Sequence, residues 1–119
     1  MPDNSTGKIG EDFTADYLVS NGFEIVKRNY HSRFGEIDII AKDKDYIVFV
    51  EVKARKKGGL TNPLEAVTKS KQMKIIKTAQ LFLLENQFDL QPRFDVAAIY
   101  TVNKKVVSVD YIDSAFGLN

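Results

Sequence analysis

The sequence has no cysteine among its 119 residues and only one histidine, His31. Without cysteine the chain forms no disulfide, no thiolate zinc site and no cysteine nucleophile. The absence also suits a reducing compartment, so we expect a cytoplasmic protein. We interpret His31 either as a solvated turn residue or as a base or phosphate contact.

Long apolar segments are also missing. No run reaches the roughly 18 apolar residues that a membrane-spanning helix needs, and residues 1–5 are too polar for a signal peptide. We therefore expect no membrane contact. A chain of 119 residues is by default one domain, here residues 1–119, and can bury one hydrophobic core.

A strong positive charge is absent as well, because the net charge is +1. Composition alone therefore does not mark a nucleic-acid binder. The basic residues are nevertheless grouped in two segments, which are Lys53, Arg55, Lys56 and Lys57, and then Lys69, Lys71, Lys74 and Lys77. Such groups indicate either solvated surfaces or contacts to phosphates.

The apolar pattern predicts two helices and five strands. In chain order these are a helix over 5–20, strands over 23–30, 36–41 and 46–54, a helix from about 62 to 86, and strands over 94–102 and 106–112. Residues 31–33 are expected to form a turn. The order α-β-β-β-α-β-β predicts an α/β fold, with helices flanking a mixed central sheet. The apolar run Ile47–Val50 favours the middle of that sheet for the third strand.

Charged residues follow this apolar run. Because side chains alternate along a strand, Glu51 and Lys53 are expected on one face, and Glu36 and Asp38 on one face of the preceding strand. Carboxylates beside a lysine, at the ends of adjacent strands, suit Mg²⁺ next to a phosphate. The pattern thus favours a nuclease. Alternatively, Glu51 and Lys53 form an ordinary ion pair on a half-exposed strand, and Asp38 is a surface acid.

Four segments carry a resemblance to known families, namely Gly10–Glu11, Gly35–Ala41, Val48–Lys53 and Arg93–Val96. Together with the element order, they resemble the PD-(D/E)XK endonuclease-like superfamily, and within it the YraN family of small bacterial proteins. The resemblance covers residues 7–112 and implies a restriction-endonuclease-like fold. The YraN family is also similar to archaeal Holliday-junction resolvases, which are dimeric, Mg²⁺-dependent and selective for DNA structure. The resemblance therefore implies branched DNA as a substrate and a homodimer.

Site roles follow from this chemistry and the resemblance. Asp38 and Glu51, with the Val52 carbonyl, are expected to hold Mg²⁺ or Mn²⁺. Lys53 is expected to contact the scissile phosphate and orient or deprotonate the attacking water. The resemblance adds Glu11 to the site, although the alternative is a surface position on the first helix. Expected nucleic-acid contacts are Arg55, Lys56, Lys57, Lys71 and Gln72, although the alternative for Gln72 is a plain surface role.

A second class of function stays open beside catalysis. A nucleic-acid-binding or protein-interaction module of the same fold could lack catalytic activity. The sequence shows no base-reading recognition helix and no aromatic stacking pattern. Any selectivity for nucleic acid is therefore expected to be for shape.

Overall fold

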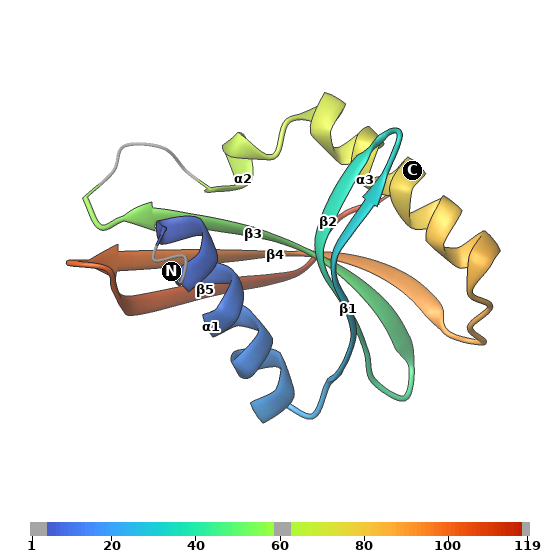
Figure 1. Ribbon diagram of the computed structural model, residues 1–119, viewed down its shortest axis with the longest axis horizontal. Coiled ribbons are helices and arrows are strands. Elements are labelled where there is room, and N and C mark those ends of the chain that lie inside the picture. The colour runs from blue at the N-terminus through green and yellow to red at the C-terminus, as the bar shows by residue number, and fades with distance from the viewer. Residues whose placement is uncertain (1–4, 59–62, 118–119) are drawn as a thin grey trace.

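Two helices lie on opposite faces of a five-stranded sheet in the computed structural model, which describes residues 5–58 and 63–117 (Figure 1). The elements in chain order are α1 (Thr6–Ser20), β1 (Glu24–Ser32), β2 (Gly35–Lys42), β3 (Tyr46–Lys56), α2 (Pro63–Ala66), α3 (Lys69–Glu85), β4 (Gln91–Val102) and β5 (Lys105–Phe116). The predicted α/β order is confirmed, with α2 as a short additional helix. Within the described ranges, no helix is long and apolar enough to cross a membrane.

The sheet is mixed, and its strands follow the order β1-β2-β3-β4-β5. β3 and β4 are parallel, whereas the other neighbouring pairs are antiparallel. The parallel pair requires the crossover through α3 that the sequence predicts. β3 lies in the middle of the sheet, as expected from its apolar run.

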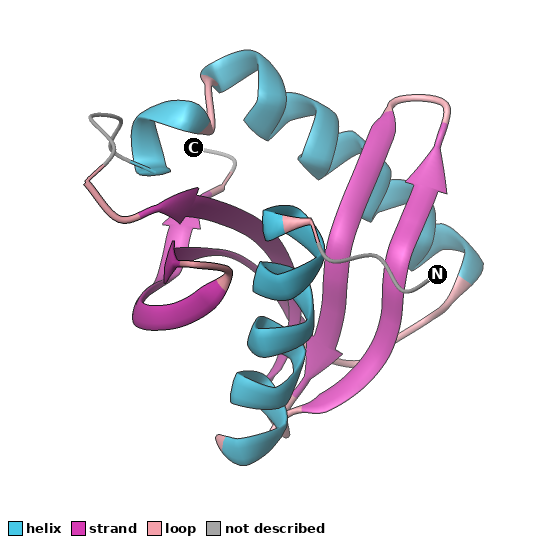
Figure 2. Ribbon diagram, turned by 60° about the vertical axis from the view of Figure 1, so that its left-hand side comes forward, coloured by secondary structure: helices cyan, strands magenta, loops and turns pink. Residues whose placement is uncertain are grey.

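The core consists of two clusters on the two faces of β3. Ile47 and Phe49 pack toward α3, and Val48 and Val50 pack toward α1. All four side chains are fully buried, because helices cover both faces at the centre of the sheet. Figure 2 shows α1 and α3 on either side of the strands.

Helix α1 lies close to β3 because of one glycine. Ser5 caps the helix by accepting a hydrogen bond from the Lys8 amide. In the next turn, a Cβ added to Gly10 would lie 2.6 Å from the Ala54 Cβ. Only glycine therefore allows this approach, which sets Glu11 beside the sheet.

Several predicted boundaries are wrong. β4 begins at Gln91 rather than at residue 94, and β5 continues to Phe116 rather than ending at residue 112. Two further errors arise because a side chain bonds to nearby backbone. β1 continues through Ser32, whose hydroxyl accepts a hydrogen bond from the Phe34 amide, so the turn lies at residues 33–34 rather than 31–33. The expected helix over 62–86 is interrupted after Ala66, because Thr68 is extended and its hydroxyl accepts from the Lys71 amide. The expected start at Asn62 lies outside the described residues.

Candidate functional site

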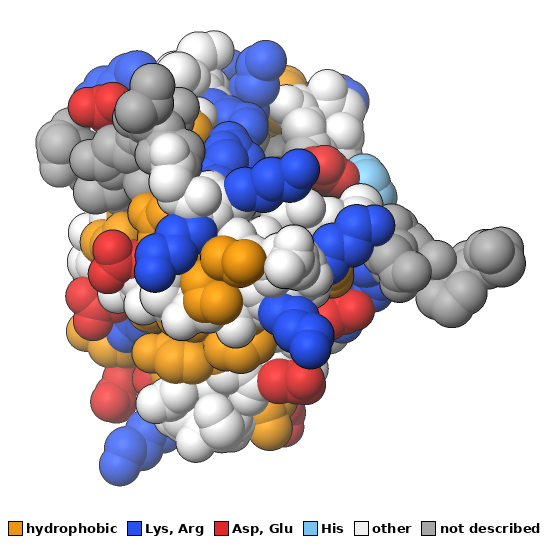
Figure 3. Space-filling view, turned by 90° about the vertical axis from the view of Figure 1, so that its left-hand side faces the viewer, with side chains coloured by type: hydrophobic (Ala, Val, Ile, Leu, Met, Phe, Trp, Pro, Cys, Tyr) orange, Lys and Arg blue, Asp and Glu red, His pale blue; other side chains and the backbone are white. Residues whose placement is uncertain are grey.

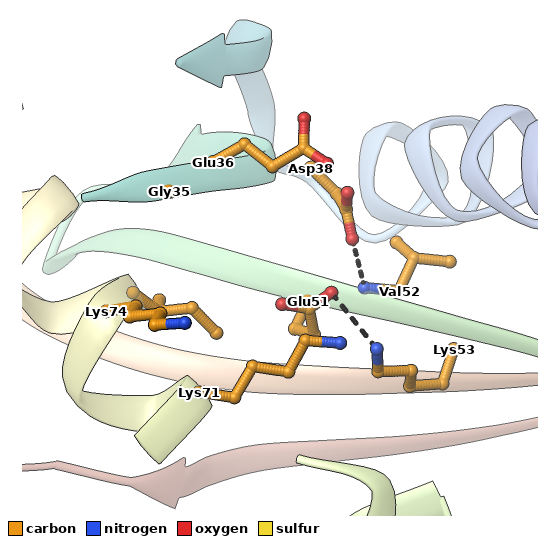
Figure 4. Close-up of a pocket in the computed structure, with 9 residues that line it drawn as sticks. Gly35, Glu36, Asp38, Glu51, Val52, Lys53, Lys71 and Lys74 are labelled. Carbon is orange, nitrogen blue, oxygen red and sulfur yellow. Dashed lines mark hydrogen bonds and ion pairs between the residues drawn. The ribbon is translucent and has the colours of Figure 1, made fainter. Parts of the chain in front are cut away.

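The candidate site lies where β2 and β3 separate. The last paired residues of the two strands are Ile39 and Val50, so Asp38 and Glu51 occupy the next register position. We call this position the fork. Asp38 Oδ2 accepts a hydrogen bond from the Val52 amide at 2.8 Å, in place of a backbone partner. The fork forms one wall of a cleft of about 390 Å³ (Figure 4).

β2 is irregular at the fork. Ile37 packs in the α3-side cluster, but Ile39 packs in the α1-side cluster, although residues two apart normally share a face. On the β1 side, the register position opposite Asp38 belongs to Asn29, which has a left-handed backbone with φ of 53°. Regular pairing is therefore interrupted on both sides of Asp38, and its carboxylate reaches the Val52 amide.

Two carboxylates share the fork in a partly dry environment. Burial, and then the neighbouring Glu51 carboxylate, raises the pKa of Asp38 from 3.8 to about 7. The hydrogen bond from the Val52 amide acts in the opposite direction. A carboxylate whose ionisation is disfavoured by burial and by a second carboxylate is suited to sharing a cation with that neighbour.

Lys53 lies beside this carboxylate pair. Its Nζ is 3.7 Å from Glu51 Oε1, and the two side chains are only 10% and 11% exposed. The shared face predicted for them is confirmed, since their charged ends meet while the Val52 side chain packs on the α1 side. The alternative of an ion pair on a half-exposed strand does not fit this burial. Burial, and then the ammonium group of Lys71, lowers the pKa of Lys53.

Helix α3 contributes two further cations to the cleft. Lys71 and Lys74 line it from one side of the helix, because residues three apart are neighbours on a helix surface. Figure 4 shows the Lys71 side chain extending from α3 toward Glu51. Lys and Arg side chains also crowd the upper half of the face in Figure 3, near the histidine. The cleft therefore combines an acidic wall, formed by the fork, with a basic edge formed by lysines of α3.

Glu11 lies near this site but does not line the cleft. Its Oε1 accepts hydrogen bonds from Arg28 Nη2 at 3.0 Å and from Asn29 Nδ2 at 2.8 Å. Its charge still contributes to the raised pKa of Asp38. Sequence reasoning missed Arg28 and Asn29. The one sequence signal for Asn29 is that an asparagine interrupts a strand pattern, because asparagine tolerates left-handed backbone.

The other predicted nucleic-acid contacts also lie outside the cleft. Arg55, Lys56 and Lys57 are exposed at the end of β3 and just after it. The Arg55 guanidinium donates to the Ala54 carbonyl at 2.9 Å. Gln72 Nε2 donates to the Val67 carbonyl at 3.0 Å. Of the five residues predicted to contact nucleic acid, the structure brings only Lys71 to the cleft.

Oxygen donors suited to a hard cation come from few residues here. Within the described ranges, no three Asp, Glu, His or Cys side chains converge to hold an ion. Glu36 lines the cleft, but its carboxylate is largely exposed and lies 3.3 Å from His31 Nδ1. The donors at the fork are thus Asp38, Glu51 and the Val52 carbonyl. Because the Val52 amide points to Asp38, its carbonyl points toward the same edge of β3.

Comparison with known proteins identifies the family. A sequence model described as "Uncharacterised protein family UPF0102" matches residues 10–99. A UPF0102 protein of Dictyoglomus turgidum is 41% identical over 118 residues, covering 98% of this chain and 100% of the relative. The UPF0102 protein of Desulforapulum autotrophicum is 45% identical over 111 residues, covering 92% of this chain and 91% of the relative. The UPF0102 protein of Clostridium botulinum is 46% identical over 116 residues, covering 92% of this chain and 92% of the relative. The chain therefore belongs to the UPF0102 family, as its resemblance to the YraN proteins implied.

Proposed function

We propose that this protein is a nuclease of the PD-(D/E)XK type, which hydrolyses phosphodiester bonds of DNA with Mg²⁺ or Mn²⁺ at the fork. One observation carries the proposal. Asp38 and Glu51 come together where β2 and β3 separate, with the buried Lys53 ammonium 3.7 Å from Glu51. Phosphodiester hydrolysis uses hard oxygen ligands that hold a metal ion, together with a positively charged side chain fixed beside them.

The donors at the fork suit Mg²⁺ or Mn²⁺. Mg²⁺ in proteins is held by one or two carboxylates and keeps several waters, so three converging side chains are not required. Asp38 and Glu51 would supply the carboxylates, and the Val52 carbonyl a third oxygen. A divalent cation there would polarise the phosphate and lower the pKa of a bound water. The pKa of Asp38, raised to about 7 without a cation, is a sign that the pair accepts positive charge readily.

Lys53 would contact the scissile phosphate and orient the attacking water. Its side chain is only 10% exposed, so its ammonium group is held in place before the substrate arrives. Glu11 would act through Asp38 rather than on the substrate, because Arg28 and Asn29 hold its carboxylate outside the cleft. Its negative charge would help the fork retain a cation.

The lysines would bind the sugar–phosphate backbone of DNA. Lys71 and Lys74 line the cleft, so they would contact phosphates next to the bond that is cut. Arg55, Lys56 and Lys57 would contact phosphates farther along the strand. We assign no phosphate contact to Gln72, because its amide is bonded to the Val67 carbonyl. Phosphate contacts of this kind carry no sequence preference.

Branched DNA is the substrate that the resemblance to Holliday-junction resolvases favours. A junction offers two equivalent strands, and a two-fold homodimer would present one cleft to each. The test is cleavage of labelled single-stranded, duplex, flap and four-way-junction DNA with Mg²⁺ or Mn²⁺. Wild type, Lys53→Ala and the control Lys44→Ala are purified identically. Lys44 is an exposed residue of the turn between β2 and β3.

We expect wild type and Lys44→Ala to cut, and Lys53→Ala to be inactive. Equal cutting by wild type and Lys53→Ala would point to a contaminating nuclease and contradict the proposal. If no protein cuts any substrate, the alternative is a nucleic-acid-binding or protein-interaction module of the same fold. That alternative predicts DNA affinity unchanged or increased in Glu51→Ala, because this variant removes a negative charge near the phosphates.

A further inference from the structure

Phe34 lies at the tip of the β1–β2 hairpin, next to the cleft. It occupies the two-residue turn with Arg33 and directly precedes Gly35 and Glu36, both of which line the cleft. Among the described side chains, it packs with neither of the two core clusters. This aromatic ring is thus half-buried, lies outside the core and stands at the edge of the proposed DNA site.

Two cations surround this ring. The Arg33 guanidinium carbon lies 4.9 Å from the ring centroid and Lys77 Nζ lies 5.5 Å from it. Both side chains are exposed, and Lys77 follows Lys74 by one turn of α3. Arg33 and Lys77 therefore place positive charge around the ring, beside the basic edge that Lys71 and Lys74 form.

The turn is held firmly against α3. Ser32 Oγ accepts from the Phe34 amide at 3.1 Å and lies 2.9 Å from Thr78 Oγ1 in α3. Thr78 in turn donates to the Lys74 carbonyl at 2.8 Å. Hydrogen bonds thus fix the backbone of the hairpin tip relative to the lysines that line the cleft.

An aromatic ring among cations, beside a phosphate site, has the chemistry of a base-stacking platform. Proteins that bind single strands combine a basic groove with aromatic rings on which bases stack. A base inside a duplex is already stacked on both sides, so only an unpaired nucleotide offers a free face. We infer that Phe34, with Arg33 and Lys77, stacks an unpaired base of the DNA strand whose phosphate occupies the cleft. This inference rests on the proposed function and deepens it, since it makes DNA with unpaired nucleotides beside the cut the preferred substrate.

Stacking of a base on the Phe34 ring is stronger than the cation–π contacts that cover the ring in the free protein. An exposed cation–π contact changes an equilibrium by about two- to fivefold. Stacking of one base on an aromatic ring contributes about 5- to 150-fold in affinity. A base therefore displaces Arg33 or Lys77 from the ring, and the released cation can pair with a flanking phosphate.

The test measures binding in EDTA, where no cleavage occurs. Affinities for a single-stranded oligonucleotide and for a blunt duplex of the same sequence are compared for wild type, Phe34→Leu and Phe34→Trp. We expect Phe34→Leu to lose about 5- to 150-fold for the single strand and less than about twofold for the duplex, which keeps only its phosphate contacts. Phe34→Trp keeps a ring and is expected to retain the wild-type preference.

Wild type also gives a test that needs no variant. Oligonucleotides carrying one 5-iodouracil at successive positions are bound and irradiated, and crosslinked peptides are identified by mass spectrometry. We expect one position to crosslink to Phe34. Absence of this crosslink, unchanged single-strand affinity in Phe34→Leu, or equal losses for single strand and duplex would overturn the inference. A wild type that crosslinks but does not cut would overturn the proposed catalysis alone.

Discussion

Asp38 and Glu51 face each other at the first register position beyond the last hydrogen-bonded pair of β2 and β3. The end of strand pairing thus creates the site. The Val52 amide, freed from β2, binds the Asp38 carboxylate at 2.8 Å instead of a carbonyl. The separation of two strands brings acidic side chains and backbone groups together without a dedicated binding loop.

Replacing Asp38 by asparagine should stabilise the protein when no metal is present. The folded state raises the pKa of Asp38 from 3.8 to about 7, so ionisation of this group opposes folding. The penalty is absent below pH 4, grows as the pH rises through 4–7 and is complete above about 7. Asp38→Asn should therefore increase the free energy of unfolding by about 2–4 kcal/mol at pH 8 and by almost nothing at pH 4.

Urea denaturation at several pH values in EDTA measures this effect. Asp110→Asn, at an exposed position of β5, is the matched control and should show no comparable gain. A gain for Asp38→Asn that does not depend on pH would contradict the electrostatic explanation.

Gly10 should be intolerant of any side chain. Alanine normally stabilises a helix relative to glycine by about 1 kcal/mol. At Gly10, however, the new Cβ would lie 2.6 Å from the Ala54 Cβ, and such overpacking costs about 1–3 kcal/mol. We expect Gly10→Ala to lower the melting temperature and Gly7→Ala in the same helix to maintain or raise it, because nothing lies within 4 Å of its Cβ. Equal effects of the two substitutions would rule out the close approach of α1 to β3.

The lysines of α3 should control the salt dependence of DNA binding. Each lost phosphate contact reduces the slope of log affinity against log salt by about 0.9 for duplex DNA. Lys71→Ala and Lys74→Ala should each show this reduction, with similar losses for unrelated sequences. Lys44→Ala should bind like wild type. Binding titrations at several salt concentrations in EDTA test this prediction. Unchanged slopes in both variants would contradict a contact between α3 and DNA.

Asp95 should be essential for stability. It is fully buried, and its carboxylate accepts hydrogen bonds from Arg93, from the Tyr111 hydroxyl at 2.5 Å and from the Ser114 amide. Asp95→Ala would leave the Arg93 charge unpaired, which costs about 3–5 kcal/mol in a buried pair. Tyr111→Phe removes one hydrogen bond and should cost about 1 kcal/mol. Chemical denaturation measures both, and a loss for Asp95→Ala no larger than that for Tyr111→Phe would contradict this role.

Local pattern was enough to predict some parts of the site. Side-chain alternation in β3 placed Glu51 and Lys53 on one face, because alternation is a property of any extended chain. The same rule is insufficient for β2, where Ile37 and Ile39 pack on opposite faces. That irregularity depends on where pairing with β3 ends, which is set by contacts between distant segments.

The surroundings of Glu11 and Phe34 could not be predicted for a similar reason. Glu11 is held by Arg28 and Asn29 only because α1 packs beside β1. Phe34 meets Lys77 only because the hairpin tip lies against α3. By contrast, the break before α3 carries a local signal, since Thr68 is a favoured helix cap.

Single-turnover cleavage of flap or junction DNA as a function of Mn²⁺ concentration tests the catalytic fork most directly. Wild type is compared with Glu51→Gln and with Glu24→Gln, which alters an exposed glutamate paired with Lys42. Wild type and Glu24→Gln should cut with the same saturable dependence on Mn²⁺, while Glu51→Gln should be slower by about 100-fold or more. Equal rates for all three proteins, or cleavage by wild type that persists in EDTA, would contradict a metal-dependent nuclease at Asp38 and Glu51.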